Sequence, residues 1–317
     1  YAATAQTQFG KSRTTVVKKA TPKKAVAKKA VSSKKKTVAS KRSKNVANRA
    51  IANARKGIQL ERASARATTL AHPGVQSSAA LVLNQLTGEV IYEKNADEST
   101  PIASITKLMT AMVVLDAKLP LNELISISRE DIDTLKGTTS RLAPGLTLTR
   151  GEMLLLALMS SENRAASALA RHYPGGRDAF IHAMNAKAIS LGMRHSRFHD
   201  ATGLNPENVS TPRELAMMVQ AARAYPEIHQ FSTASEYLFT SNLSRREMAF
   251  RNTNPLVKQD DWEIGLSKTG YINEAGRCLV MQARISDTPV VIVLMDSNGK
   301  YTRIGDAQRV RKWLETS

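Results

Sequence analysis

Strand-like apolar runs stand at both ends of residues 73–317, and helical patterns fill the middle. The runs are 79–85, 89–94, 277–285 and 289–296. Thr87-Gly88 joins the first two as expected for an antiparallel hairpin. Strands need partners, and helices cover the faces of a sheet. The sequence therefore predicts an α/β (α+β) fold, in which N- and C-terminal strands share one antiparallel sheet beside a mostly helical subdomain.

The helical middle carries recognisable start signals. Thr100 is suited to cap a helix with Pro101 at its first position, and "IASITKLMTAMVVLDAK" then continues with apolar residues on nearly every side. Such a helix is expected to be central and buried. Thr149-Arg150-Gly151-Glu152 fits a capping box at the start of a second helix. Further helices are predicted at 177–192 and 211–225.

A last helix is predicted over 301–315, with one apolar stripe. The stripe consists of Ile304, Ala307, Val310, Trp313 and Leu314. It could be an amphipathic membrane anchor or a surface that packs on the sheet. We favour packing, because the stripe is short and the helix follows the last strand closely. The sequence contains no run of about 18 apolar residues, so no transmembrane helix is predicted.

The first part of the chain has a different composition. Residues 1–70 contain 19 lysines and arginines and one acid, Glu61, and so carry +18 of the chain's net charge of +19. Such a segment cannot bury enough apolar surface to offset its ordering entropy. We predict a disordered basic tail over 1–72, with a weak helical tendency at 45–67. The turn signal His72-Pro73-Gly74 marks the start of one folded domain, 73–317.

Several classes of site lack their signatures. The single cysteine, Cys278, excludes an internal disulfide and is expected to be a small core residue, since it lies in the apolar run "AGRCLVMQARI". There is no H-E-x-x-H, no cluster of cysteine and histidine, and no G-x-x-x-x-G-K. We therefore expect no metal ion and no cofactor.

Ser104 and Lys107 are three residues apart in an otherwise apolar stretch, "PIASITKLMT". On a helix this spacing makes them neighbours, so the lysine amine can reach the serine hydroxyl. An ammonium in a dry apolar site loses its preference for the charged form, and the neutral amine can take the proton of a serine nucleophile. Taken alone, the pair is more often an ordinary solvated turn.

Two further motifs strengthen the catalytic interpretation. Ser161-Glu162-Asn163 interrupts an apolar helix, although serine and asparagine also occur at ordinary helix ends. Lys268-Thr269-Gly270 precedes the C-terminal strands. Glycine in a strand allows close approach of another backbone, such as a peptide substrate laid along the sheet edge. The order S-x-x-K, S-x-N, K-T-G, at separations of roughly 55 and 105 residues, is a much stronger signal than any single motif.

With these motifs the chain resembles the penicillin-recognising serine D,D-peptidases, the group of the low-molecular-mass penicillin-binding proteins and the class A β-lactamases. The stretches "PIASITKLMTAMVVLDA", "LLLALMSSENRAA", "FRNTN", "SKTGYINEAG" and "HDATGLNPENVST" resemble the D-alanyl-D-alanine endopeptidase subgroup. The resemblance extends from about residue 75 to the end of the chain. It implies a β-lactamase/D,D-peptidase-like fold.

The resemblance also implies roles for the first two motifs. Ser104 would attack the carbonyl of a D-alanyl peptide bond and become acylated, with Lys107 as its general base. Ser161 and Asn163 would relay the proton to the leaving amine and hold the substrate amide.

The third motif would bind the substrate. Lys268 and Thr269 would hold the carboxylate next to the scissile bond, and Gly270 would let the substrate strand lie close. The backbone N–H groups of Ser104 and Tyr271 would form the oxyanion hole, in which each donor is worth about 10²–10³ in rate.

Two comparisons within the group refine the expected activity. Class A β-lactamases deacylate with a glutamate-held water from an E-x-x-L-N segment, and none occurs between Asn163 and Lys268. β-Lactams should therefore act as covalent inhibitors. The 47 residues after Gly270 are too few for the extra β domain of many carboxypeptidase relatives. We favour an endopeptidase that cuts peptidoglycan cross-links over a carboxypeptidase that trims pentapeptide tails.

Location and partners follow from the same interpretation. The chain begins at Tyr1 without an apolar leader, which fits an exported mature protein as well as it fits a fragment. A periplasmic enzyme of cell-wall biogenesis and cell shape is expected, whose tail binds anionic envelope polymers. Two rival interpretations are a nucleic-acid- or envelope-binding protein acting through the tail, and a catalytically dead binding module on the same fold.

Overall fold

The computed structural model describes residues 72–316. The predicted disordered tail, apart from His72, and the weak helix at 45–67 lie outside the described residues.

The centre of the fold is a five-stranded antiparallel sheet with the order β2-β1-β11-β10-β9. The strands are β1 (Ala79–Asn84), β2 (Val90–Lys94), β9 (Glu263–Ile272), β10 (Gly276–Ile285) and β11 (Thr288–Ser297). The N-terminal hairpin joins the C-terminal strands through the pairing of β1 with β11. The predicted shared sheet is thus confirmed.

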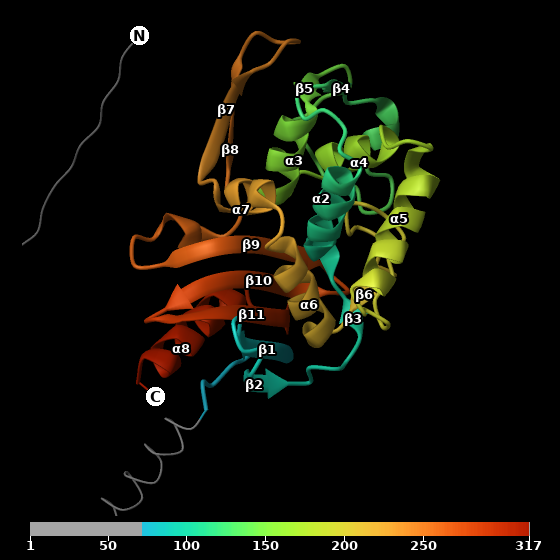
Figure 1. Cartoon of the computed structure of the whole chain (residues 1–317). Coiled ribbons are helices and arrows are strands. Elements are labelled where there is room, and N and C mark those ends of the chain that lie inside the picture. Colours follow the sequence, from blue (N-terminus) through green and yellow to red (C-terminus); the bar gives the residue numbers. More distant parts are fainter. Residues whose placement is uncertain (1–71, 317) are drawn as a thin grey trace, which may run out of the picture. The chain divides into compact units, whose positions relative to one another are not determined.

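Alternate residues of these strands enter two separate cores, because successive side chains of a strand point to opposite faces. Leu81, Val280 and Val293 belong to a large core that also contains the helices of the middle region. Their neighbours Val82 and Ile292 belong to a smaller core beneath α8 (Thr302–Thr316). Figure 1 shows α8 on one side of the strands and most other helices on the opposite side.

The stripe of α8 packs on the sheet, as the favoured interpretation predicted. Ala307 and Val310 are fully buried there. Asp306 is also buried, and its carboxylate accepts hydrogen bonds from the backbone N–H groups of Gln76 and Ser77. The last helix therefore holds the segment that leads into β1.

The helical region surrounds α2 (Thr106–Asp116), which is buried over most of its length. Around it stand α3 (Arg150–Met159), α4 (Asn163–Arg171), α5 (Gly176–Ser190), α6 (Pro212–Ala222) and α7 (Pro226–Thr233) (Figure 1). The predicted capping box at Thr149 and Glu152 is present at the start of α3. In residues 72–316, no helix is both long and apolar enough to cross a bilayer.

The predicted start of the central helix is wrong. Thr100 and Pro101 form a short strand, β3, which pairs with β6 (Val209–Ser210). The chain then passes through Ala103, whose φ of 48° is left-handed, into a 3-10 turn, η1 (Ala103–Ile105). Because Thr100 and Pro101 pair with β6, they do not cap the helix, and α2 begins only at Thr106.

The sequence did not indicate the short elements that complete the helical region. These are α7, the hairpin β7 (Glu236–Thr240) with β8 (Glu247–Arg251), the pair β4 (Leu124–Ser126) with β5 (Thr147–Thr149), and the 3-10 turns η2 (Arg129–Asp131) and η3 (Pro255–Lys258).

Candidate active site

Ser104 and Lys107 meet where η1 passes into α2. The Lys107 Nζ atom lies 2.7 Å from the Ser104 Oγ atom, as the three-residue spacing predicted. Lys107 has no solvent exposure, and it stands among apolar residues of α2. Burial lowers the pKa of the Lys107 amine to about 7, although Asp200 and Glu162 act in the opposite direction.

The other partners of Lys107 are two carbonyl oxygens. Its Nζ atom lies 2.7 Å from Asn163 Oδ1 and 2.6 Å from the backbone oxygen of Thr202. A neutral amine has two N–H bonds and one lone pair. Carbonyl oxygens can only accept, so both N–H bonds are directed to them and the lone pair is left for the Ser104 hydroxyl. The geometry thus suits a lysine that acts as a base.

Ser161 lies in the bend between α3 and α4, and Asn163 is the first residue of α4, so the helix is interrupted at this motif as the sequence predicted. Ser161 has a φ of 61°, a costly backbone conformation for a residue with a Cβ. Its hydroxyl accepts a hydrogen bond of 2.8 Å from Lys268 Nζ. The side chain of Asn163 contacts Lys107 on one side and donates to Thr138 Oγ1 on the other. The bend therefore connects both lysines of the site.

The K-T-G motif lies on β9, which is an edge strand of the sheet. Lys268 is almost completely buried, and its pKa is lowered well below the usual range by burial and by the charges of Lys107 and Arg303. The Thr269 hydroxyl donates to Thr253 Oγ1 at 2.6 Å. This concentration of positive charge is suited to receive an anion.

Gly270 lies against the backbone that carries the nucleophile. A Cβ atom at this position would be 3.0 Å from the Ile102 carbonyl oxygen and 3.1 Å from the Ser104 nitrogen. A close backbone approach at Gly270 is therefore present, but its partner is the chain's own segment 102–104, and the approach of a substrate strand stays a prediction. Tyr271, the next residue, is half-exposed, and its ring lies 4.3 Å from the guanidinium of Arg277.

The loop 199–208 supports Ser104 and Lys107, a role that the motifs did not reveal. Asp200 accepts hydrogen bonds from the backbone N–H groups of Thr202 and Asn205 at 2.9 Å each. Asn208 donates to Thr106 Oγ1 in α2 and to the Asp200 backbone oxygen. This network holds the Thr202 carbonyl that Lys107 contacts. The signal in the sequence was the cluster of turn residues in "HDATGLNPEN".

Arg303 of α8 is a second residue of the site that the sequence did not reveal. Its guanidinium donates to the backbone oxygen of Gly270 at 2.7 Å and to that of Cys278 at 3.2 Å. Burial lowers the pKa of Arg303. Cys278 itself is a buried core residue, as predicted, and burial raises the pKa of its thiol to about 11.

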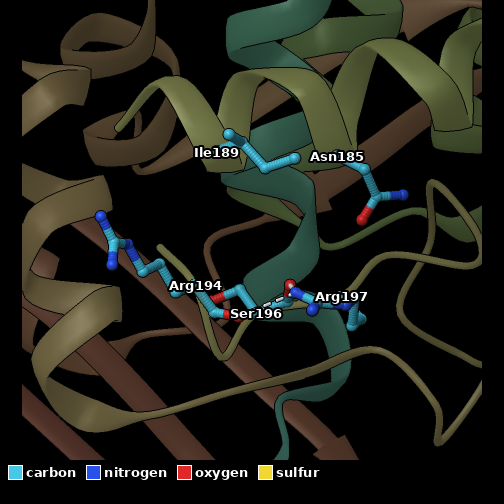
Figure 2. A pocket seen from close by; sticks show the side chains of 5 residues that line it. All are labelled: Asn185, Ile189, Arg194, Ser196 and Arg197. Carbon is cyan, nitrogen blue, oxygen red and sulfur yellow. Dashed lines mark hydrogen bonds between the residues drawn. The ribbon is translucent and has the colours of Figure 1, made fainter. Parts of the chain in front are cut away.

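A pocket between α5 and the segment after it is lined by Asn185, Ile189, Arg194, Ser196 and Arg197 (Figure 2), none of which belongs to the three motifs. Within residues 72–316, no group of three or more histidine, cysteine and acidic side chains is placed to hold a metal ion.

Comparison with known proteins agrees with this geometry. The model of the D-alanyl-D-alanine carboxypeptidase family, Peptidase S11, matches residues 66–299. The chain belongs to this family. It is therefore a serine D,D-peptidase, and the non-enzyme interpretations are set aside.

Individual relatives are similar over most of the chain. A protein of Pseudomonas aeruginosa named D-alanyl-D-alanine endopeptidase is 52% identical over 240 residues, 76% of this chain and 77% of its own. One of the same name from Escherichia coli K12 is 51% identical over 253 residues, 80% of this chain and 82% of its own. The crystal structure of the Streptomyces K15 DD-transpeptidase superposes with a TM-score of 0.71 at 28% identity, covering 76% of this chain and 97% of that one. The predicted fold is confirmed.

Proposed function

We propose that this D,D-peptidase is a D-alanyl-D-alanine endopeptidase, which cleaves peptide cross-links of peptidoglycan through a Ser104 acyl-enzyme. One observation carries the proposal: a fully buried lysine, with its pKa lowered to about 7, lies 2.7 Å from the hydroxyl of Ser104. The names of the two relatives at 52% and 51% identity support the endopeptidase specificity.

Substrate binding would use the positive charge beside β9. The carboxylate next to the scissile bond would pair with Lys268 and the Thr269 hydroxyl, near the guanidinium of Arg303. The substrate backbone would lie along the edge strand, where main-chain hydrogen bonds give affinity. Gly270 keeps β9 close to Ser104, so that a peptide on the strand is within reach of the nucleophile.

In the acylation step, Lys107 takes the Oγ proton of Ser104 while the Oγ–carbon bond forms. The negative charge that develops on the carbonyl oxygen would be stabilised by the backbone N–H groups of Ser104 and Tyr271. Collapse of the tetrahedral intermediate breaks the carbon–nitrogen bond. The proton passes to the leaving amine through Ser161, with Asn163 holding the substrate amide. Water then hydrolyses the ester and restores the free serine.

The same chemistry explains inhibition by β-lactams. The lactam carbonyl would acylate Ser104, but the opened ring keeps the leaving amine in place.

A carboxypeptidase that removes the last residue of pentapeptide tails is the second candidate, favoured by the description of the family that residues 66–299 match.

The biological setting completes the proposal. Residues 73–317 form the catalytic domain, and the enzyme acts in the periplasm on the wall that sets cell shape. The basic tail, 1–72, concentrates it on anionic envelope polymers, since 19 of the chain's 46 lysines and arginines lie in the first 70 residues. Deletion of residues 1–70 should weaken sacculus binding and remove most of its salt dependence. Unchanged binding that is independent of salt would contradict the role of the tail.

The catalytic proposal is tested by labelling with a fluorescent penicillin, with Ser104→Ala as the control. The wild type should form a stable band on a denaturing gel, and the variant should form none. Digestion of purified cross-linked muropeptides then separates the two candidate activities: an endopeptidase converts dimers to monomers, and a carboxypeptidase releases D-alanine from pentapeptide tails. Folded wild-type protein that takes no label would refute the acyl-enzyme.

A further inference from the structure

A hydrogen-bond chain connects the loop 132–146, between η2 and β5, to the second motif of the site. The Nδ2 atom of Asn163 donates to Thr138 Oγ1 at 3.1 Å, and the Thr138 hydroxyl donates to Asp133 Oδ2 at 2.7 Å. At its other end the amide accepts from Lys107 through Oδ1 at 2.7 Å. Asp133 and Thr138 belong to none of the three motifs, yet a single side chain links them to the catalytic lysine.

Asp133 acts in this chain only as an acceptor. Its Oδ1 atom accepts from the backbone N–H groups of Leu135 and Lys136, and its Oδ2 atom accepts from the backbone N–H group of Thr138 at 2.8 Å. Burial raises the pKa of Asp133, but the hydrogen bonds that the carboxylate accepts outweigh this effect and lower the pKa below its usual value. An ionised carboxylate has no hydrogen to donate, so the proton in its contact with the Thr138 hydroxyl comes from Thr138.

The direction of this bond determines the orientation of the Asn163 amide. A hydroxyl has a single hydrogen, and that of Thr138 is committed to Asp133. Toward Asn163 the Thr138 oxygen can therefore only accept, which requires the N–H end of the amide. The carbonyl end then faces Lys107, so the lysine donates to it. A reversed amide would place two oxygen atoms against each other at Thr138, with no hydrogen between them.

The charged form of Lys107 could maintain this orientation without help. An ammonium has three hydrogens and no lone pair, so it requires the Oδ1 atom of Asn163 as an acceptor. The neutral amine can also accept, and a reversed amide would use the lone pair that is otherwise directed at Ser104. Within residues 72–316, the Asn163 side chain forms hydrogen bonds only with Lys107 and Thr138. In the neutral form that acts as the base, Thr138 therefore determines which end of the amide faces the lysine.

The same orientation would serve substrate binding. The Nδ2 atom of Asn163 carries two hydrogens, and Thr138 accepts one of them. The second remains for the carbonyl of the substrate amide that Asn163 would hold. A reversed side chain would present an oxygen to that carbonyl and would repel it.

We propose that Asp133 and Thr138 are positioning residues for acylation. They set the direction of the hydrogen bonds that run through Asn163, and so keep the lone pair of the neutral Lys107 on Ser104. Both residues act through Asn163 rather than on the reacting atoms. The proposal rests on the acyl-enzyme mechanism proposed above, in which Lys107 is the base.

Thr138 is the better position for a test, because its hydroxyl can be removed while the loop keeps its other bonds. Thr138→Val retains the shape of the side chain and the backbone N–H group that donates to Asp133, and it lacks the hydroxyl. Thr138→Ser retains the hydroxyl and is the matched control. For each protein the rate of acylation by fluorescent penicillin is measured from pH 5 to 9. The charges of Asp200 and Glu162, which raise the pKa of Lys107, are the same in all of them.

Without the Thr138 hydroxyl, the amide of Asn163 can reverse and donate to the neutral lysine. Thr138→Val should therefore acylate at least about tenfold more slowly than the wild type on the plateau above pH 7, since the base has lost its free lone pair. The rising part of its pH profile should move to lower pH, because an N–H group that faces Lys107 disfavours the ammonium and lowers its pKa. Thr138→Ser should match the wild type in both respects.

Two results would overturn the proposal. Thr138→Val with the rate and the pH profile of the wild type would show that the amide keeps its orientation without the hydroxyl. A slower plateau with an unshifted rising part would show that the loop has merely moved away from the site. Wild-type protein that takes no label would instead contradict the acyl-enzyme itself.

A double variant tests whether the effect passes through Asn163. Asn163→Ala removes the amide, so it should acylate slowly, and Thr138→Val should then cause no further change in the rate or the pH profile. If Thr138→Val slows acylation as much without the amide as with it, the hydroxyl acts by another route and the positioning role is wrong.

Discussion

Gly203 is the residue whose replacement should damage the site most specifically. It has a φ of 80°, and a Cβ atom there would lie 1.9 Å from the carbonyl oxygen of Ala103 and 2.9 Å from the nitrogen of Ser104. Both neighbours are backbone atoms, which cannot rotate away. In Gly203→Ala, the segment 102–104 or the loop that carries Thr202 must move by about 1.5 Å to reach an ordinary contact distance.

The size of the effect follows from what this movement displaces. Thr202 provides one of the carbonyl oxygens that hold Lys107, and the segment 102–104 carries the nucleophile. A misplacement of about 1 Å can cost about 10²-fold in rate. The left-handed conformation itself costs a residue with a Cβ about 1–2 kcal/mol. We therefore expect about 10²-fold slower acylation by fluorescent penicillin and a loss of stability larger than the conformational cost alone.

A matched control separates the effect of the steric clash at Gly203 from the cost of placing a residue with a Cβ in the left-handed conformation. Gly192 has nearly the same φ, 82°, and a Cβ there would meet no atom within 4 Å. Gly192→Ala should lose about 1–2 kcal/mol in urea denaturation and acylate at the wild-type rate. If Gly203→Ala acylates within threefold of the wild type, the argument that Gly203 sets the position of the serine is refuted.

Three further predictions concern charges. Acylation by penicillin should rise about tenfold per pH unit below pH 7 and level off above it, because Lys107, with a pKa of about 7, acts only when deprotonated; a flat profile from pH 5 to 8 would contradict this role. Asp200→Asn should shift the rising part of this pH profile to lower pH, since the Asp200 carboxylate raises the pKa of Lys107. Asp306→Ala should cost about 2–4 kcal/mol in urea denaturation with normal penicillin labelling, because it leaves the N–H groups of Gln76 and Ser77 without acceptors.

The sequence predicted the parts of the fold that depend on local pattern. The hairpin, the last strands and the capping box at Thr149 are all present. Each is determined by alternation or by side-chain chemistry within a few residues. The pairing of β1 with β11 could also be expected, because the apolar runs at the two ends had no other strands to join.

What the sequence could not predict depends on backbone atoms and distant partners. Thr100 and Pro101 match a helix start, yet pairing with Val209 and Ser210 makes them a strand. The Thr202 carbonyl has no residue-type signature, since every residue carries one. Its part in holding Lys107 arises only when the loop 199–208 folds beneath α2.

The two buried lysines of the site have different hydrogen-bond partners. These partners suit Lys107 to act as a base and Lys268 to bind an anion. Lys107 contacts two carbonyl oxygens and a hydroxyl, so its neutral form loses no hydrogen bond and gains a lone pair directed at Ser104. Lys268 contacts Ser161 and its neighbour's carbonyl, with no carboxylate among its hydrogen-bond partners. A substrate carboxylate would supply that missing anion and stabilise the charged form of Lys268.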